Sequence, residues 1–398
     1  MKKIKLYGRA DAPDLYPIRD FLLRSVVDFD WEESNAPHPK IEFPDGKLIV
    51  DPNIEQIATA LGWISKPTYA EYDLSIYGAG PAGLSAAVYA ASEGLKTVLV
   101  EREAIGGQAG TSSLIENYMG FPGGIAGAEL AERARQQALS FGVEILLLRE
   151  GIKGSFYDNR IHVDLANGDK LMAKANICAT GVDYTKLHLP NESRYLHKGI
   201  YYGAGASEAC FCRDKDIFIV GGGNSAGQAA VYFSSFARKV YMVVRRGNLS
   251  DTLSDYLIKR IAHIGNIQVI YNAEVTELDG EEYLSAIKIY HKEKGESLWW
   301  DTAKLFICIG GKPHTEWASE TAICRDRNGY LITGSDLIGR NDFHDCWKLK
   351  RQPYHLETSV PGSFAAGDVR FNSVKRIASA VGEGAMAVTQ VHQYLATL

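Results

Sequence analysis

The sequence predicts an α/β protein built from two doubly wound parallel sheets, with a smaller unit ahead of them. The main observation is a repeat: a buried strand, a glycine-rich turn, a helix and a second strand follow one another from about residue 74, and again from about residue 217. A second observation is the number of glycines, 39 among 398 residues, which gather in clusters. Such clusters indicate tight turns and close approach of the backbone to a ligand.

The composition excludes several classes of protein. Hydrophobic residues make up 46% of the chain, charged residues 23%, and the net charge is −5. This is a globular balance without the basic excess of a protein that binds nucleic acid or an anionic membrane. We expect no secretory signal, no transmembrane stretch and a cytoplasmic location. The six cysteines show no C-x-x-C and no metal-ligand spacing, which predicts reduced thiols and no metal site.

Residues 1–68 have the pattern of a small separate domain. A strand, an amphipathic helix, a hairpin about a Pro-Asp-Gly turn and a second helix follow one another, with Asn53 placed to cap the second helix. This order is the outline of a thioredoxin-like unit. The predicted elements span residues 4–7, 16–24, 40–43, 47–50 and 53–61.

The first glycine-rich turn, Gly78-x-Gly80-x-x-Gly83, joins a strand to a helix. In such a turn the first glycine allows the bend, the second lets the backbone approach a pyrophosphate, and the third lets the helix pack on the strand. The helix N-terminus adds unpaired N–H groups. Glu101 ends the next strand, about 20 residues on, where a carboxylate can bind a ribose 2′-hydroxyl. This arrangement predicts a dinucleotide without a 2′-phosphate, such as FAD.

The second turn, Gly221-x-Gly223-x-x-Ala226, repeats the pattern with one difference. Its second strand ends in Arg245 and Arg246 instead of an acid. Guanidinium groups at this point pair with a ribose 2′-phosphate, which a carboxylate would repel. The second site is therefore predicted to prefer NADPH over NADH.

Residues 72–398 resemble the low-molecular-weight thioredoxin reductases, a branch of the pyridine nucleotide-disulfide oxidoreductases. Besides the two glycine loops, the chain matches the segments that wrap the flavin, the two crossovers between domains, a second FAD motif and the segment ahead of the last helix. These matches are Gly106-Gly107-Gln108, Glu116-Asn117-Tyr118, Ala179-Thr180-Gly181, Cys308-Ile309-Gly310-Gly311-Lys312-Pro313, Phe364-Ala365-Ala366-Gly367-Asp368-Val369, and Lys375-Arg376 through Gly382-Glu383-Gly384.

The resemblance implies two Rossmann-like domains, a homodimer and two cofactors. The FAD domain would comprise residues 69–187 and 316–398, with an NADPH domain, 188–315, inserted in it. The last helix would point its N-terminus at the flavin near Ala385 and Met386. The implied FAD residues are Gly78, Gly80, Pro81, Ala82, Gly83, Glu101, Gly107, Gln108, Asn117, Gly181, Gly367, Asp368, Lys375, Arg376 and Ala385. The implied NADPH residues are Gly221, Gly223, Asn224, Ser225, Ala226, Arg245, Arg246 and Gly310.

The sequence departs from this family at the redox-active C-x-x-C. Its two positions fall on Ala204 and Ser207, which cannot form a disulfide. Cys210 and Cys212 follow, but a C-x-C disulfide would be strained, and we expect these thiols to pack as small hydrophobic groups. The N-terminal unit resembles a shortened glutaredoxin-like domain, and it has Ala12-Pro13-Asp14-Leu15 where that family has C-P-x-C.

These features predict a flavin-dependent oxidoreductase that passes a hydride from NADPH to FAD and electrons onward to a non-disulfide acceptor, either a small molecule or an electron-carrier protein. Three alternatives remain open. They are a ferredoxin/flavodoxin–NADP reductase, a disulfide reductase that uses Cys210 and Cys212, and a flavin-bearing redox sensor. No side chain stands out as a catalytic acid or base.

Overall fold

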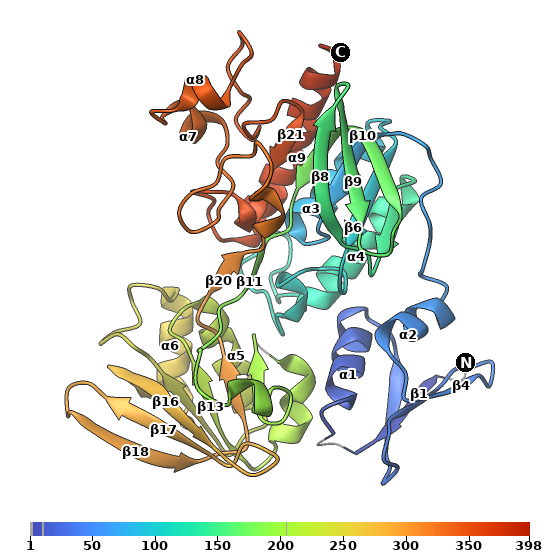
Figure 1. Ribbon diagram of the computed structural model, residues 1–398. Coiled ribbons are helices and arrows are strands. Elements are labelled where there is room, and N and C mark those ends of the chain that lie inside the picture. Colours follow the sequence, from blue (N-terminus) through green and yellow to red (C-terminus); the bar gives the residue numbers. More distant parts are fainter. Residues whose placement is uncertain (1–2, 10–11, 204) are drawn as a thin grey trace. The chain divides into compact units, whose positions relative to one another are not determined.

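The computed structural model describes residues 3–9, 12–203 and 205–398, and these form two compact units (Figure 1). The first unit contains residues 1–56, 111–115 and 184–311, and the second contains 57–110, 116–183 and 312–398. Two of the chain's passages between the units run through a pair of strands, β11 (Val182–Tyr184) and β20 (Gly311–Pro313). Among the described residues, no helix is long and apolar enough to cross a membrane.

The second unit is organised around a mostly parallel sheet (Figure 1). Its strands follow the order β7-β6-β5-β10-β9-β8, and β21 pairs with β10. The central strands are apolar and buried on both faces, as a parallel sheet between covering layers requires. The strands are β5 (Tyr72–Tyr77), β6 (Thr97–Glu101), β7 (Glu144–Leu147), β8 (Gly151–Tyr157), β9 (Arg160–Leu165), β10 (Lys170–Cys178) and β21 (Ser363–Ala365).

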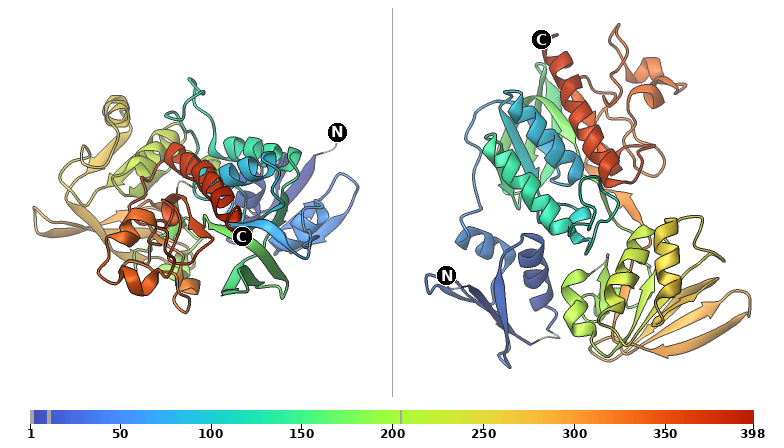
Figure 2. Two further views of the ribbon diagram at one scale, coloured as in Figure 1. Left: turned by 90° about the horizontal axis from the view of Figure 1, so that it is seen from above. Right: turned by 180° about the vertical axis from the view of Figure 1, so that it is seen from behind.

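Three helices lie side by side on this sheet, with α3 between α4 and α9 (Figure 2, right). The helices α3 and α9 pack closely because Gly384 has no side chain: a Cβ there would lie 2.2 Å from the Ala82 carbonyl oxygen. The helical segments of this unit include α3 (Pro81–Ser92), α4 (Gly127–Ser140), η4 (Glu316–Ala318), α7 (Gly334–Ile338), α8 (Phe343–Cys346), η5 (Gly367–Val369) and α9 (Ile377–Leu395), and η1 (Ala109–Thr111) spans the boundary.

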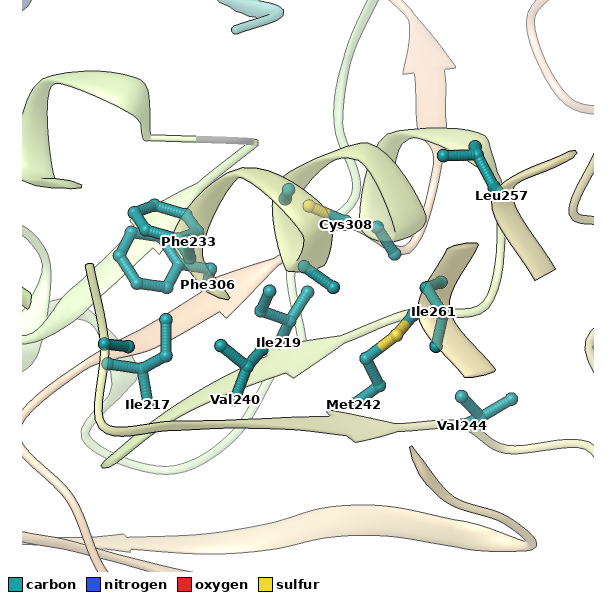
Figure 3. Packing of buried hydrophobic residues seen from close by; sticks show 14 of the residues in the cluster. Ile217, Ile219, Phe233, Val240, Met242, Val244, Leu257, Ile261, Phe306 and Cys308 are labelled. Carbon is teal, nitrogen blue, oxygen red and sulfur yellow. The ribbon is translucent and has the colours of Figure 1, made fainter. Parts of the chain in front are cut away.

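The larger part of the first unit has a five-stranded parallel sheet in the order β12-β19-β13-β14-β15 and a separate antiparallel sheet, β16-β17-β18. Its core lies between α5 and the parallel strands, where the rings of Phe233 and Phe306 are 4.3 Å apart (Figure 3). The elements are η2 (Glu192–Tyr195), β12 (Ile200–Tyr202), η3 (Ala206–Cys212), β13 (Asp216–Val220), α5 (Asn224–Ser234), β14 (Lys239–Val243), α6 (Asp255–His263), β15 (Ile267–Ile270), β16 (Ala273–Asp279), β17 (Ala286–His291), β18 (Glu296–Asp301) and β19 (Leu305–Ile307).

The N-terminal part of the first unit forms a four-stranded sheet, β2-β1-β3-β4, in which β1 and β2 are parallel. The predicted second helix is capped as expected, because the Asn53 side chain accepts from the Gln56 N–H at 2.8 Å. The sequence prediction missed β2, whose Phe-Asp-Trp-Glu-Glu sequence has no buried residue. The elements are β1 (Ile4–Gly8), α1 (Leu15–Arg24), β2 (Phe29–Glu33), β3 (Lys40–Glu42), β4 (Leu48–Val50) and α2 (Ile54–Ala60), of which α2 spans the boundary of the two units.

Candidate functional site

The first glycine loop lies at the edge where the parallel strands of the second unit end. Gly78, directly after β5, donates its N–H to the Val100 carbonyl at 2.8 Å, and Ala179, directly after β10, donates to Tyr77 at 2.8 Å. The backbone of β21 continues this edge, since Ala366 donates to Cys178 at 3.0 Å. Ligands of doubly wound sheets bind at this carboxyl edge.

The three glycines of this loop meet different surroundings. Gly78 has φ +100°, and a Cβ there would lie 2.4 Å from the Ala179 carbonyl oxygen. A Cβ on Gly83 would lie 1.8 Å from the Gly78 oxygen, so both outer glycines are needed by the fold itself. Gly80 is different, because a Cβ there would meet nothing within 4 Å. Open space beside Gly80, with Pro81 and Ala82 starting α3 behind it, fits a pyrophosphate at a helix N-terminus.

Glu101 is positioned by the loop. Its carboxylate is buried, with 7% of the residue exposed, and accepts the N–H of Ala79 at 2.7 Å and that of Glu103 at 2.8 Å. A carboxylate at this place, the end of the second strand, is the group that accepts a ribose hydroxyl in dinucleotide sites. The residues present therefore fit the adenosine half of FAD.

Two neighbouring segments reach the same loop. A Cβ on Gly107 would lie 3.2 Å from the Gly80 Cα, and the Gln108 side chain donates to the Val182 carbonyl at 2.7 Å, next to Gly181. Asn117 is exposed, and no hydrogen bond described in the structure joins it to the other predicted residues.

The second FAD motif lies against the start of α3. A Cβ on Gly367 would lie 2.9 Å from the Ala82 Cβ, and the Lys375 ammonium donates to the Asp368 carbonyl at 2.6 Å. Burial raises the pKa of the Asp368 carboxyl, and burial lowers the pKa of Lys375. Both shifts mark a partly dehydrated region at the sheet edge.

Sequence reasoning missed Glu383, which holds this motif in place. Its carboxylate accepts the Gly367 N–H at 2.6 Å and pairs with the Arg370 guanidinium at 2.7 Å. The residue carries one signal in the sequence, an acid between two glycines in an otherwise small and apolar stretch.

The expected start of the last helix is wrong. The helix α9 begins at Ile377, with Arg376 as its N-cap residue, and Ala385 lies two turns inside it. The N–H groups that a helix end offers to a ligand therefore belong to residues that follow Arg376, including Ile377 and Ala378, which sequence reasoning also missed. The glycines at 382 and 384 suggested a turn, but they are accommodated in the helix, and Gly384 packs against α3.

The second glycine loop repeats the backbone pattern of the first. Gly221 donates to Val243 at 3.0 Å, and Cys308 donates to Val220 at 2.8 Å. Gly221 has φ +142°, and a Cβ there would lie 2.3 Å from the Cys308 oxygen. A Cβ on Gly223 would meet only the Thr252 oxygen, 4.0 Å away, so this loop also leaves its middle glycine open.

The other residues predicted for NADPH surround this loop. The Asn224 side chain, at the start of α5, accepts the Ser254 N–H at 2.8 Å, while the next residues are an exposed Ser225 and a fully buried Ala226. Arg245 and Arg246 follow β14 and are exposed, with Arg246 3.8 Å from the Asp251 carboxylate.

Gly310 completes the predicted NADPH set. It follows β19, is exposed and has φ +91°, and a Cβ there would meet nothing within 4 Å. The strand before it, β19, pairs with β13. A second glycine therefore lies at the carboxyl end of the strand next to the second loop.

The segment where the family carries its dithiol is covered by the N-terminal part of the first unit. Ala204 lies outside the described residues, whereas Ser207 is 5% exposed and its hydroxyl lies 3.5 Å from the Asp20 carboxylate of α1. Cys212 is fully buried, and burial raises its pKa to about 12. Cys210 is exposed, so the two thiols have unlike surroundings.

A buried group of charges joins α1 to η3. The Glu208 carboxylate pairs with the Arg19 guanidinium and, at 2.5 Å, with the Lys304 ammonium. All three side chains are less than a tenth exposed. The Arg19 guanidinium also lies over the Phe211 ring, 4.2 Å from its centre.

Comparisons with known proteins agree with this geometry. The profile of the family named pyridine nucleotide-disulphide oxidoreductase matches residues 72–384. The chain is 31% identical to a thioredoxin reductase of Treponema pallidum, over 82% of this chain and 98% of that one, and 33% identical to one of Bacillus subtilis, over 82% and 96%. The crystal structure of Lactococcus lactis thioredoxin reductase superposes with a TM-score of 0.73 at 30% identity, covering 82% of this chain and 100% of that one.

The predicted fold, with two Rossmann-like domains, and the predicted cofactors, FAD and NADPH, are those of these proteins. The matches extend over both glycine loops and both sheet edges described above. The chain belongs to the pyridine nucleotide-disulphide oxidoreductase family and is similar to its thioredoxin reductases.

Proposed function

We propose that this protein is an NADPH-dependent FAD oxidoreductase whose electron acceptor is not a disulfide reduced through a C-x-x-C dithiol. When bound, FAD supplies the redox chemistry, taking a hydride from NADPH and passing electrons onward. The acceptor would be a small molecule or an electron-carrier protein, and the active form a homodimer in the cytoplasm.

This proposal rests on the residue at position 207, a buried serine where the family has a cysteine. A thiol that exchanges with a protein disulfide has to be accessible and reactive. Here the position holds a buried serine next to Asp20, and the segment is tied to α1 by the Arg19–Glu208 pair. The unit therefore offers neither the sulfur nor the access that the dithiol reaction requires.

Cys210 and Cys212 do not supply a substitute. A dithiol that turns over with a protein disulfide has at least one accessible thiol of lowered pKa. The pKa of both is instead raised, that of the exposed Cys210 by partial loss of water around its sulfur and that of Cys212 by full burial in the hydrophobic core. Reduction of a disulfide through this pair is therefore not favoured.

The chain's own residues would act by binding and orientation. The amides around Gly80 and Gly223 would hold the two pyrophosphates, and Glu101 would bind the FAD ribose. Arg245 and Arg246 would select the 2′-phosphate of NADPH. The pyrophosphate contacts would come from the backbone, and the ribose contacts from these three side chains.

The test is an anaerobic titration of the purified yellow protein with NADPH, followed by a screen of acceptors. We expect the flavin absorbance to be bleached, and reoxidation by a quinone, by oxygen or by ferredoxin coupled to cytochrome c. Failure to bleach would favour a redox sensor.

The decisive comparison uses thioredoxin disulfide as the acceptor. We expect little reduction by the wild type and the same low rate for Cys210→Ser, whose exposed position makes it a mild change. Rapid reduction of thioredoxin that Cys210→Ser abolishes would contradict the proposal.

A further inference from the structure

Two cysteines far apart in the sequence meet in the second unit. The Sγ atoms of Cys324 and Cys346 are 3.1 Å apart, although the residues are separated by 22 positions. Both are half-buried and both are free thiols. In the part of the chain that the structure describes, no other two cysteines have a sulfur–sulfur contact.

Each thiol is held by ordered structure. The Cys324 N–H donates to the Ser359 hydroxyl at 2.7 Å, and its carbonyl accepts from Ile332 at 3.0 Å. Cys346 ends α8 and precedes Trp347, which is 4% exposed and packs with Ile332. The short sulfur–sulfur distance therefore follows from two anchored backbones and does not depend on a flexible side chain.

The charges near this pair act in opposite directions, because the Arg340 guanidinium lowers the pKa of Cys346 and the Asp342 carboxylate raises it. The Arg340 guanidinium interacts electrostatically with both sulfurs while it is held by Asp342 at 2.7 Å. A neighbouring cation stabilises the thiolate that forms during exchange. Burial raises the pKa of Cys346 to about 11, so this residue rests as the thiol.

We propose that Cys324 and Cys346 form a reversible intramolecular disulfide by exchange with a low-molecular-weight disulfide. One thiolate attacks the reagent disulfide, forms a mixed disulfide and releases one reagent thiol. The second thiolate then attacks the protein sulfur of the mixed disulfide and releases the other. Two protein thiols are thereby oxidised by two electrons, the reagent disulfide is reduced to two thiols, and the two protons pass to those thiols.

The bond would close a loop that contains α7 and most of α8, next to the second FAD motif. Leu331 donates its N–H to Val369 at 3.0 Å, and Asn372 donates its side-chain N–H to Asp336 at 3.0 Å. Oxidation would thus fasten a segment next to residues that contact Val369 and Asn372, within and just after the Gly367–Arg370 stretch. The proposal concerns a site separate from the glycine loops and does not depend on the identity of the electron acceptor.

The test is to equilibrate the full-length protein with oxidised glutathione, remove the reagent, and alkylate free thiols with N-ethylmaleimide under denaturing conditions. We expect four of the six cysteines to be alkylated, and a tryptic peptide pair joined through Cys324 and Cys346. Reduction with dithiothreitol before alkylation should restore all six.

Two variants complete the test. Cys210→Ser removes an exposed thiol outside the pair and should still lose two thiols on oxidation, whereas Cys324→Ser should give no cross-linked peptide and a glutathione adduct on Cys346. If Cys324→Ser fails to fold, Cys346→Ser serves equally, and the wild-type peptide map needs no variant. Full alkylation of the wild type, or adducts on Cys210 without the cross-link, would overturn the proposal.

Discussion

Among single residues, we expect Gly80 to be needed for cofactor binding but not for folding. Its backbone has φ −74° and ψ −176°, which any residue can adopt, and a Cβ would enter open space. We expect Gly80→Val to fold but to lose FAD, because the side chain fills the place of the pyrophosphate. The measurement is flavin absorbance per chain after purification.

The control for this change is Gly265→Val, where a Cβ also meets nothing within 4 Å. That variant should keep its flavin and, once the flavin has been removed, show the same thermal unfolding as Gly80→Val. A yellow Gly80→Val protein would remove the assignment of this loop to FAD.

The two exposed arginines after β14 should distinguish NADPH from NADH through the charge of the ribose 2′-phosphate. Replacing both Arg245 and Arg246 by Gln removes charge-assisted hydrogen bonds worth about 1.5–3 kcal/mol. We expect the ratio of kcat/KM for NADPH to that for NADH to fall by about 10- to 100-fold. Arg238→Gln, which removes an exposed charge paired with Asp216 instead, should leave the ratio unchanged.

At the scale of elements, two glycines in α9 should respond in opposite directions. A Cβ on Gly382 meets nothing within 4 Å, so Gly382→Ala should raise the free energy of unfolding by about 0.5–1 kcal/mol through helix propensity. Gly384→Val should lower it and weaken flavin retention, since its side chain would collide with the Ala82 backbone of α3. Denaturant unfolding and flavin content measure both, and equal behaviour of the two variants would be evidence against this packing.

The contact between α1 and η3 depends on a buried acid between two buried cations. Glu208→Gln leaves the charges of Arg19 and Lys304 without their partner, and breaking such a pair costs about 3–5 kcal/mol. The exposed pair of Lys5 and Glu32 is the matched comparison, because Lys5→Gln should change stability by less than about 1 kcal/mol. Chemical denaturation should show a much larger fall in the free energy of unfolding for Glu208→Gln than for Lys5→Gln.

At the scale of the whole molecule, local patterns predicted the elements well and distant contacts poorly. The strand–glycine–helix repeats were recognisable because each requires particular residues within a short stretch, as in Gly78 to Gly83. The start of α9 was misplaced because helix packing, not local propensity, decides that its glycines stay helical. The Cys324–Cys346 contact and the pairing of Arg19 with Glu208 join residues distant in the sequence, so no local sequence pattern predicts them.

The second glycine loop can be changed to test whether the two cofactors bind independently. Gly223 has an extended backbone, with φ −98° and ψ −179°, and open space beside it, so Gly223→Val should fold and block the NADPH pyrophosphate. The FAD loop belongs to the other unit, so this variant should stay fully yellow. Dithionite should bleach its flavin as in the wild type, whereas NADPH should not.

Gly221→Val should instead disturb folding, because Gly221 has φ +142° and a Cβ there would collide with the Cys308 oxygen. We expect that variant to lose stability as well as NADPH binding, whereas Gly223→Val loses binding alone. If NADPH bleached the Gly223→Val protein at the wild-type rate, the repeat of strand, loop and helix would mark only a shared fold, and the electron donor would have to bind elsewhere.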